Sequence, residues 1–199
     1  DKKQLSIIAR QGSGSSCRSI YGGYVKWLKG NNSNDSYAVQ IANENYFDMH
    51  DIIAIVSKEP KQISSRDAMK ITVDTSKMYK FRLEHVERSI KEMEDAILKK
   101  DFNVIGNLAE IDCLIMHACI MTSTPPTFYW LPVTQEIMKS VAGWRREGIG
   151  AYFTIDAGPN VHVLTLPEYA KEVEKRLDYI DGVVETISCK PGEDAKVIA

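Results

Sequence analysis

The sequence has little of what several classes of protein require. Its 199 residues include four cysteines but no CxxC pair, which makes a zinc site of the usual spacing a poor interpretation. Basic and acidic residues nearly balance, 25 against 27, so no overall charge attracts nucleic acid or an anionic membrane. No apolar run approaches the roughly 20 residues that span a bilayer. We therefore expect a cytoplasmic protein with reduced thiols and no metal site, which binds neither nucleic acid nor membrane.

The composition is that of a globular protein, and the pattern of apolar residues predicts the α+β class. With 44% hydrophobic and 26% charged residues, the chain can form one good core or two small ones. Apolar residues recur at helical spacing in some segments and form short continuous runs in others, so helices and strands interleave. We expect helices near residues 20–28, 77–100, 101–120, 133–146 and 167–179, and strands near 51–56, 151–155, 161–165, 182–189 and 196–198.

The first candidate site is a cluster of small residues from Gly12 to Ser19. Small residues before a helix leave backbone N–H groups free, and the helix dipole adds partial positive charge there. The hydroxyls of Ser13 and Ser15 add donors, and Arg18 can grip a carboxylate or phosphate with two parallel hydrogen bonds. The alternative is a flexible linker with a helix cap. The segment is not a Walker loop, because no Gly-Lys-Ser/Thr follows it.

Two further segments carry polar groups that suit chemistry. Asp156 opens an Asp-Ala-Gly-Pro-Asn turn between two expected strands, where it could accept a proton from a hydroxyl or orient that hydroxyl. The alternative is an ordinary hairpin turn, in which these residue types are common. Ser65 and Arg66 follow Ser64 at an expected helix start, so Arg66 is either a second anion clamp or a solvated side chain. The four histidines show no metal spacing, and His117 is interpreted as a hydrogen-bonded core residue.

Taken together and in order, four segments closely resemble mevalonate diphosphate decarboxylases, which belong to the superfamily of galactokinase, homoserine kinase, mevalonate kinase and phosphomevalonate kinase. The first is Ile-Ala-Arg-Gln-Gly-Ser-Gly-Ser-Ser-Cys-Arg-Ser-Ile-Tyr-Gly-Gly-Tyr-Val at residues 8–25. The second is residues 63–76. The third is residues 116–129, which contain Met-His-Ala-Cys followed by Pro-Pro. The fourth is Ala-Tyr-Phe-Thr-Ile-Asp-Ala-Gly-Pro-Asn at residues 151–160. The resemblance runs from about Leu5 to Thr165 and more faintly to the end.

The resemblance implies a fold in two parts. Residues 1–45 would complete an amino-terminal domain like the second domain of ribosomal protein S5. Residues 46–199 would form a ferredoxin-like carboxy-terminal domain, with the active site in the cleft between the two.

The resemblance also implies an activity and its residues. Such enzymes use ATP and Mg²⁺ to phosphorylate the 3-hydroxyl of mevalonate 5-diphosphate, and loss of phosphate and CO₂ then gives isopentenyl diphosphate. Asp156 would engage the 3-hydroxyl. Arg18 would hold the substrate carboxylate with Ser13, Ser15 and the backbone around Gly14. Arg66 would grip the 5-diphosphate beside Ser65, and Thr75 is a weaker candidate.

Several alternatives remain open at the level of sequence. The family's ATP-binding loop, Pro-x-x-x-Gly-Leu-x-Ser-Ser-Ala, does not occur here, so we expect this chain to be inactive without an upstream half that carries the ATP and Mg²⁺ sites. The complete enzyme is expected to be a homodimer. A phosphomevalonate decarboxylase and a mevalonate 3-kinase are the enzymatic alternatives, although Asp156 argues against the 3-kinase. A non-catalytic dimerisation or ligand-sensing module is the alternative from another class.

Overall fold

The computed structural model describes residues 1–60 and 63–197, and these form two compact units. Unit 1 consists of residues 1–48 together with the tail that begins at Lys190. Unit 2 consists of Met49–Cys189. Both helices and strands occur, so the expected α+β class is confirmed.

Unit 1 is a small assembly around a two-stranded antiparallel sheet. It contains helix α1 (Lys2–Gly12), the 3-10 helix η1 (Gly14–Ile20) and strands β1 (Tyr24–Trp27) and β2 (Ala38–Ala42). A single buried hydroxyl joins three of these elements. Ser6 of α1 donates from Oγ to the Cys17 carbonyl of η1 at 3.0 Å and accepts from the Ala38 N–H of β2 at 2.8 Å. All three residues are fully buried, so these bonds fix η1 against its neighbours.

The helix expected near residues 20–28 is wrong, because this segment contains a turn and strand β1. Tyr24 and Trp27 fit a helical spacing, but two glycines precede them. Gly23 has a φ of +68°, and a Cβ there would lie 2.4 Å from the Ala42 carbonyl oxygen. The backbone therefore turns into a strand that pairs with β2, from Tyr24 with Ala42 to Trp27 with Ala38, and the register shifts between Tyr24 and Val25.

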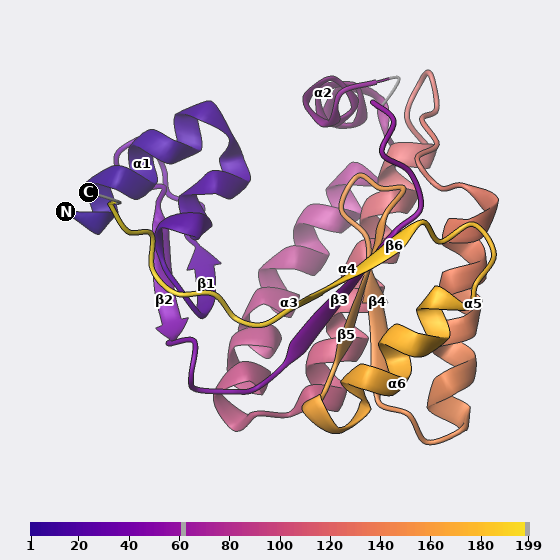
Figure 1. Cartoon of the computed structure of the whole chain (residues 1–199). Coiled ribbons are helices and arrows are strands. Elements are labelled where there is room, and N and C mark those ends of the chain that lie inside the picture. Colours follow the sequence, from indigo (N-terminus) through magenta and orange to yellow (C-terminus); the bar gives the residue numbers. More distant parts are fainter. Residues whose placement is uncertain (61–62, 198–199) are drawn as a thin grey trace. The chain divides into compact units, whose positions relative to one another are not determined.

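The end of the chain returns to unit 1. The Gly23 N–H donates to the Gly192 carbonyl at 2.8 Å, and the Gly22 N–H donates to the Asp194 carboxylate at 3.0 Å. Lys2 forms an ion pair with Asp194, so the segment around residues 192–194 lies beside the start of α1 (Figure 1). The division drawn from the sequence placed these residues in the second domain, whereas their contacts place them in unit 1. No strand forms at 196–197, and residue 198 of the strand expected there lies outside the described residues.

Unit 2 is built on a four-stranded antiparallel sheet with the order β4-β5-β3-β6. Its strands are β3 (His50–Ile55), β4 (Ala151–Thr154), β5 (Val161–Thr165) and β6 (Glu185–Cys189). Helices α5 (Pro132–Arg146) and α6 (Pro167–Asp178) cover one face (Figure 1). Helices α3 (Tyr79–Lys99) and α4 (Phe102–Met121) pack together, and α4 also lies against β4, while α2 (Ser65–Thr75) packs on α4.

The core of unit 2 follows the alternation along its strands. Side chains from β3, β4 and β5 that point to the α5–α6 side are fully or nearly fully buried, among them Ile52, Phe153 and Val163. They meet Ile137 and Val141 of α5 in one cluster. The expected hairpin, its flanking strands, the helices near 77–120, 133–146 and 167–179, and the Asp101 cap of α4 are confirmed. All four cysteines are free, as expected.

By length and composition α4 could cross a membrane, which the sequence analysis did not anticipate. The same helix carries the polar side chains Glu110 and His117, which are buried in unit 2. Arg145 of α5 donates to Glu110 through two nitrogens, at 2.7 and 2.9 Å, and the Phe153 N–H of β4 donates to Glu110 at 3.0 Å. Such contacts are those of a core helix, since a charged pair tied to a strand requires a folded protein around it.

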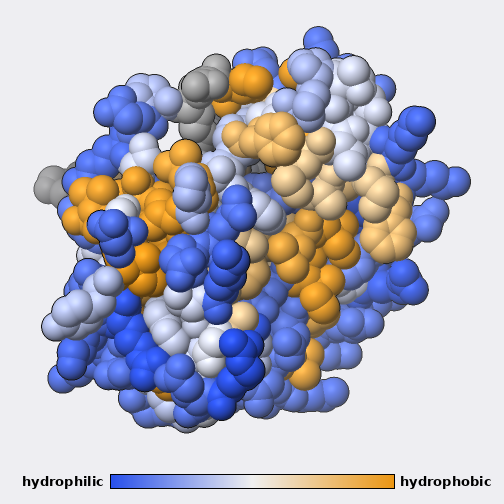
Figure 2. Space-filling view, turned by 90° about the vertical axis from the view of Figure 1, so that its right-hand side faces the viewer, coloured by the Kyte–Doolittle hydropathy of each residue, from blue (hydrophilic) through white to orange (hydrophobic). Residues whose placement is uncertain are grey.

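Hydrophobic side chains also reach the surface. Figure 2 shows several hydrophobic patches separated by hydrophilic residues on one face. The exposed apolar residues of unit 2 include Phe128, which is 70% exposed, and Val184, which is 60% exposed.

Candidate active site

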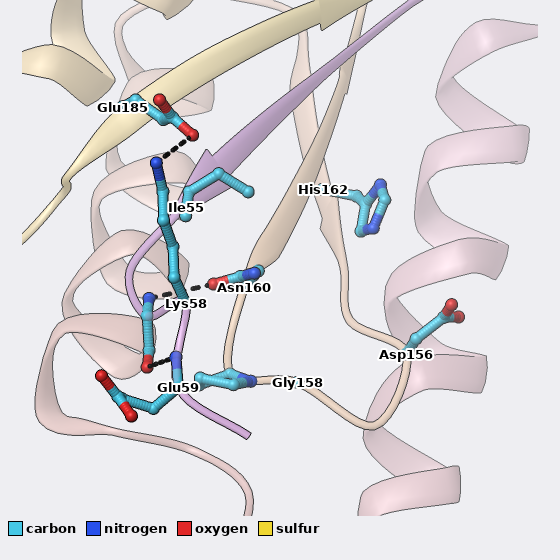
Figure 3. A pocket seen from close by; sticks show the side chains of 10 residues that line it. Ile55, Lys58, Glu59, Asp156, Gly158, Asn160, His162 and Glu185 are labelled. Carbon is cyan, nitrogen blue, oxygen red and sulfur yellow. Dashed lines mark hydrogen bonds and ion pairs between the residues drawn. The ribbon is translucent and has the colours of Figure 1, made fainter. Parts of the chain in front are cut away.

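A hollow of about 420 Å³ lies in unit 2, at the end of the sheet where the β4–β5 hairpin turns. Asp156 and His162 occupy the hairpin side of this pocket (Figure 3). Lys58 and Glu185 occupy the other side, where they form an ion pair of 2.9 Å. The remaining lining residues are Ile55, Ser57, Glu59, Gly158, Pro159 and Asn160.

The turn that carries Asp156 is fastened from two sides. Gly158 has a φ of +92°, a conformation that glycine adopts without strain. Asn160 accepts hydrogen bonds at its Oδ1 from the backbone N–H groups of Val56, at 2.9 Å, and Ser57, at 3.1 Å, just beyond β3. The buried Thr134 at the start of α5 donates to the Pro159 carbonyl at 2.8 Å. The turn therefore holds a fixed position relative to β3 and α5.

Helix α4 fastens the strand end that leads into the turn. Cys113 and His117 lie one helical turn apart on α4 and share a face. The Ile155 N–H donates to the Cys113 sulfur at 3.2 Å, and His117 Nε2 lies 2.9 Å from the Asp156 carbonyl oxygen. Burial lowers the pKa of His117, so its ring is neutral and Nε2 carries the proton that this carbonyl accepts. Burial also raises the pKa of Cys113 to about 11, which keeps it a thiol.

A histidine–carboxylate pair forms the third feature of the pocket. His162 Nδ1 lies 2.8 Å from Asp51 Oδ2, and about a third of each side chain is exposed. The hydrogen bond to Asp51, supported by the charges of Asp51 and Asp156, raises the pKa of His162 against the effect of burial. The sequence analysis assigned no role to either residue.

The Gly12–Ser19 cluster lies in unit 1 and differs from its expected form. Ser13 ends α1, and η1 follows at once, so the cluster does not begin a long helix. The hydroxyls of Ser13 and Ser15 lie 3.3 Å apart, and the side chain of Arg18 is exposed. Gly14 packs against the indole of Trp27, and a Cβ at this position would lie 3.0 Å from the ring. The cluster keeps its exposed hydroxyls and cation, but it forms a seven-residue 3-10 helix in place of the start of the expected longer helix.

Ser65 and Arg66 lie in the first turn of α2, in unit 2. Ser64 caps this helix by accepting from the Asp67 N–H at 3.1 Å, as expected, and Arg66 is exposed. Ile63, just before the cap, lines a second hollow of about 480 Å³ together with Pro159 of the Asp156 turn. The Thr75 hydroxyl donates to the Ile71 carbonyl and accepts from the Thr124 N–H, which gives this weaker candidate a structural role.

Unit 2 therefore holds Asp156, Ser65 and Arg66, whereas Ser13, Gly14, Ser15 and Arg18 belong to unit 1. A cleft shared by the two groups stays a prediction. Sequence reasoning missed Asn160 and His162 as lining residues of the pocket, and it missed Asp51 as the partner of His162. The hairpin pattern could have placed Asn160 and His162 near Asp156, but only the pairing of β3 with β5 brings Asp51 to His162.

Comparisons with known proteins agree on one family. Residues 51–194 match the mevalonate 5-diphosphate decarboxylase C-terminal domain, and residues 1–38 match the diphosphomevalonate decarboxylase-like N-terminal domain. Diphosphomevalonate decarboxylase of Debaryomyces hansenii is 39% identical over 180 residues, which cover 87% of this chain and 45% of that protein. The chain thus spans about half the length of the curated relatives it matches.

Solved structures give the same result. Mevalonate diphosphate decarboxylase from Staphylococcus aureus has a TM-score of 0.90 at 36% identity, over 98% of this chain and 59% of that one. A structure of MDDEF in complex with MVAPP, AMPPCP and magnesium has a TM-score of 0.91 at 36% identity, over 98% of this chain and 60% of that one.

Proposed function

Since the chain belongs to the mevalonate 5-diphosphate decarboxylase family, we propose that the complete polypeptide uses ATP to convert mevalonate 5-diphosphate to isopentenyl diphosphate. The observation that carries this proposal is the position of Asp156. It is an exposed carboxylate on a turn held by Asn160 and Thr134, at the edge of a hollow, in the motif that the family uses for catalysis.

The chemistry requires a group that directs the 3-hydroxyl toward the phosphoryl donor. Asp156 would accept a hydrogen bond or a proton from that hydroxyl, and a carboxylate on a fixed turn needs little reorganisation to do so. Phosphorylation turns the hydroxyl into a good leaving group. When the C3–O bond breaks, its electrons leave with the phosphate, and electrons from the C–CO₂ bond form the new double bond.

Holding the substrate's anionic groups is the work we assign to the other residues. Arg18 would hold the carboxylate, with the hydroxyls of Ser13 and Ser15 and the backbone at Gly14. Arg66, beside Ser65, would hold the 5-diphosphate. The exposure of both arginines supports these roles, because an exposed guanidinium can meet a ligand in two parallel hydrogen bonds.

ATP and Mg²⁺ belong to the proposal for the complete polypeptide. A relative has been solved with AMPPCP and magnesium. Within residues 1–60 and 63–197 there is no group of three or more potential metal ligands, so we derive no step through Mg²⁺ from this chain. We assign the nucleotide and metal sites to the upstream half. A cytoplasmic homodimer completes the proposal, and size measurement and cell fractionation of the complete polypeptide would test it.

The experiment is ATP-dependent release of CO₂ by the complete polypeptide from mevalonate, its 5-phosphate and its 5-diphosphate. CO₂ from the 5-diphosphate alone is the expected result. CO₂ from the 5-phosphate would identify a phosphomevalonate decarboxylase, and ADP without CO₂ would identify a 3-kinase. Release of neither CO₂ nor ADP from any of the three substrates would favour a non-catalytic module. The Asp156→Asn variant should lower kcat by about 10² to 10⁴, because it removes the acceptor for the hydroxyl proton.

A further inference from the structure

The pocket around Asp156 contains a second polar group that the proposed function does not use. His162 lies on β5 directly opposite Thr154 of β4 and Ile53 of β3, so its side chain shares their face of the sheet. That face is turned away from the α5–α6 core, where Val161 and Val163 are buried. The ring of His162 lies on the same side of the pocket as Asp156 (Figure 3).

Asp51 determines which ring nitrogen of His162 is available. Its Oδ2 accepts the proton of Nδ1 at 2.8 Å. In the part of the chain that the structure describes, Nε2 has no hydrogen-bond partner, so it is the nitrogen left to meet a ligand. A carboxylate that orients an imidazole in this way also stabilises its protonated form, in which Nε2 is a donor.

The charges around His162 favour the imidazolium. Asp51 on β3 and Asp156 on the turn are the charged groups that act on it, and both raise its pKa. Lys58, Glu59 and Glu185 line the rest of the pocket, and Lys58 is paired with Glu185. Besides the paired Lys58, the pocket therefore offers His162 Nε2 beside the carboxylate proposed to engage the 3-hydroxyl.

We propose that His162, held by Asp51, binds the phosphoryl group at the 3-oxygen of the substrate through its Nε2–H and stabilises it as it leaves as phosphate. This inference rests on the proposed function, in which Arg18 holds the carboxylate and Arg66 holds the 5-diphosphate. The phosphoryl group is the remaining anion, and it is attached to the oxygen that Asp156 engages. A donor in the Asp156 pocket is thus placed for the charge that grows when the C3–O bond breaks.

Kinetics of the complete polypeptide give the first test. His162→Leu should lower kcat for CO₂ release by about a hundredfold with a small change in KM, as expected for loss of one donor to a developing anion. His162→Gln keeps a donor without the charge and should recover part of the loss. His85→Gln, on α3 and outside the pocket, is the matched control and should change neither constant.

The pH dependence separates this role from a structural one. The imidazolium of His162 loses its proton as pH rises through its raised pKa, so kcat should decline at high pH. Asp51→Asn removes the main cause of the raised pKa and should move that decline to lower pH. If Asp51→Asn lowers kcat by the same factor at every pH and leaves the pH of the decline unchanged, the proposal is overturned.

A binding measurement keeps this inference distinct from the proposed function. In NMR spectra of the complete polypeptide labelled with ¹³C-histidine, inorganic phosphate should raise the pKa of His162 further. Mevalonate, which carries a carboxylate and no phosphate, should not. A response to mevalonate alone, or to neither anion, would overturn the phosphate assignment. A response to phosphate without CO₂ release from any substrate would leave the site standing and remove the proposed function.

Discussion

The Asp156 turn and the Ser13–Arg18 segment are the two regions proposed to meet substrate, and they are built differently. Three side chains from two helices of unit 2 hold the turn or the residue before it: the Thr134 hydroxyl of α5, and the Cys113 thiol and His117 imidazole of α4. Within unit 1, Ser13 precedes the seven-residue 3-10 helix η1, which contains Arg18 and is tied to α1 and β2 through one buried serine.

The difference teaches where rigidity is needed for the chemistry. A group that handles a proton must stay within hydrogen-bonding reach of the reacting atom, so its backbone is fixed from several elements. A group that holds an anion can work at the end of a long, exposed side chain, because a guanidinium adapts its position to the ligand. The following predictions test this contrast, from the largest expected effect to the smallest.

Removing the Asn160 side chain should have the largest effect on stability. Asn160→Ala leaves the Val56 and Ser57 N–H groups without their acceptor, at a cost of about 2 to 4 kcal/mol in the free energy of unfolding. Loosening the turn should also lower kcat. Urea unfolding and CO₂ release would measure the two effects. Asn45→Ala, an exposed asparagine of unit 1, is the control and should change stability by less than about 0.5 kcal/mol.

Retained kcat in a destabilised Asn160→Ala variant would contradict the link between a fixed turn and catalysis.

Asn160 also shows how much of the turn could be predicted from the sequence. Asp-Ala-Gly-Pro-Asn between two apolar runs predicts a hairpin turn, and the turn is present. The donors that fix it come from positions 56, 57 and 134, and local residue preferences carry no information about such distant partners.

The corresponding change in unit 1 should cost less. Ser6→Ala leaves the buried Ala38 N–H and the Cys17 carbonyl without a partner, so we expect a loss of about 1 to 3 kcal/mol. Chemical denaturation followed by tryptophan fluorescence would measure it, since Trp27 lies in this unit. Ser19→Ala, at an exposed position, should be neutral. A neutral Ser6→Ala would mean that η1 is held by other contacts.

The helix wrongly expected near residues 20–28 belongs to this region. Its apolar spacing fitted a helix, but Gly23 must adopt a positive φ beside β2, and Tyr24 to Trp27 gain backbone partners from Ala38–Ala42. Spacing could not reveal the pairing, because strand β2 itself has no strong alternation. In contrast, α3 was predictable from its sustained apolar stripe, and α4 was predictable from the Asp101 cap at its start.

Two histidines of the Asp156 region should give opposite pH effects, each confined to a limited range. His117 has a lowered pKa, so the unfolded chain binds its proton more readily, and its contribution to stability is lost as pH falls below about 6.5. His162 has a raised pKa, so its contribution is present at low pH and is lost as pH rises through that pKa. Unfolding free energies from pH 5 to 8 should lose the acid-side slope in His117→Gln and the alkaline-side slope in His162→Gln. The same slopes in both variants would contradict the assignments.

Gly14→Ala should affect stability least and yet report directly on function. The new Cβ would lie 3.0 Å from the Trp27 ring, but that indole is 37% exposed and can move by the few tenths of an ångström required. We expect a change within about 0.5 kcal/mol, since alanine also restricts the unfolded chain. If the backbone at Gly14 meets the substrate carboxylate, the added methyl group should still raise KM severalfold while kcat changes little. Gly12→Ala, where a Cβ meets nothing within 4 Å, is the matched control. Equal KM values in the two variants would remove Gly14 from the site and leave Arg18 as the basis of anion binding in unit 1.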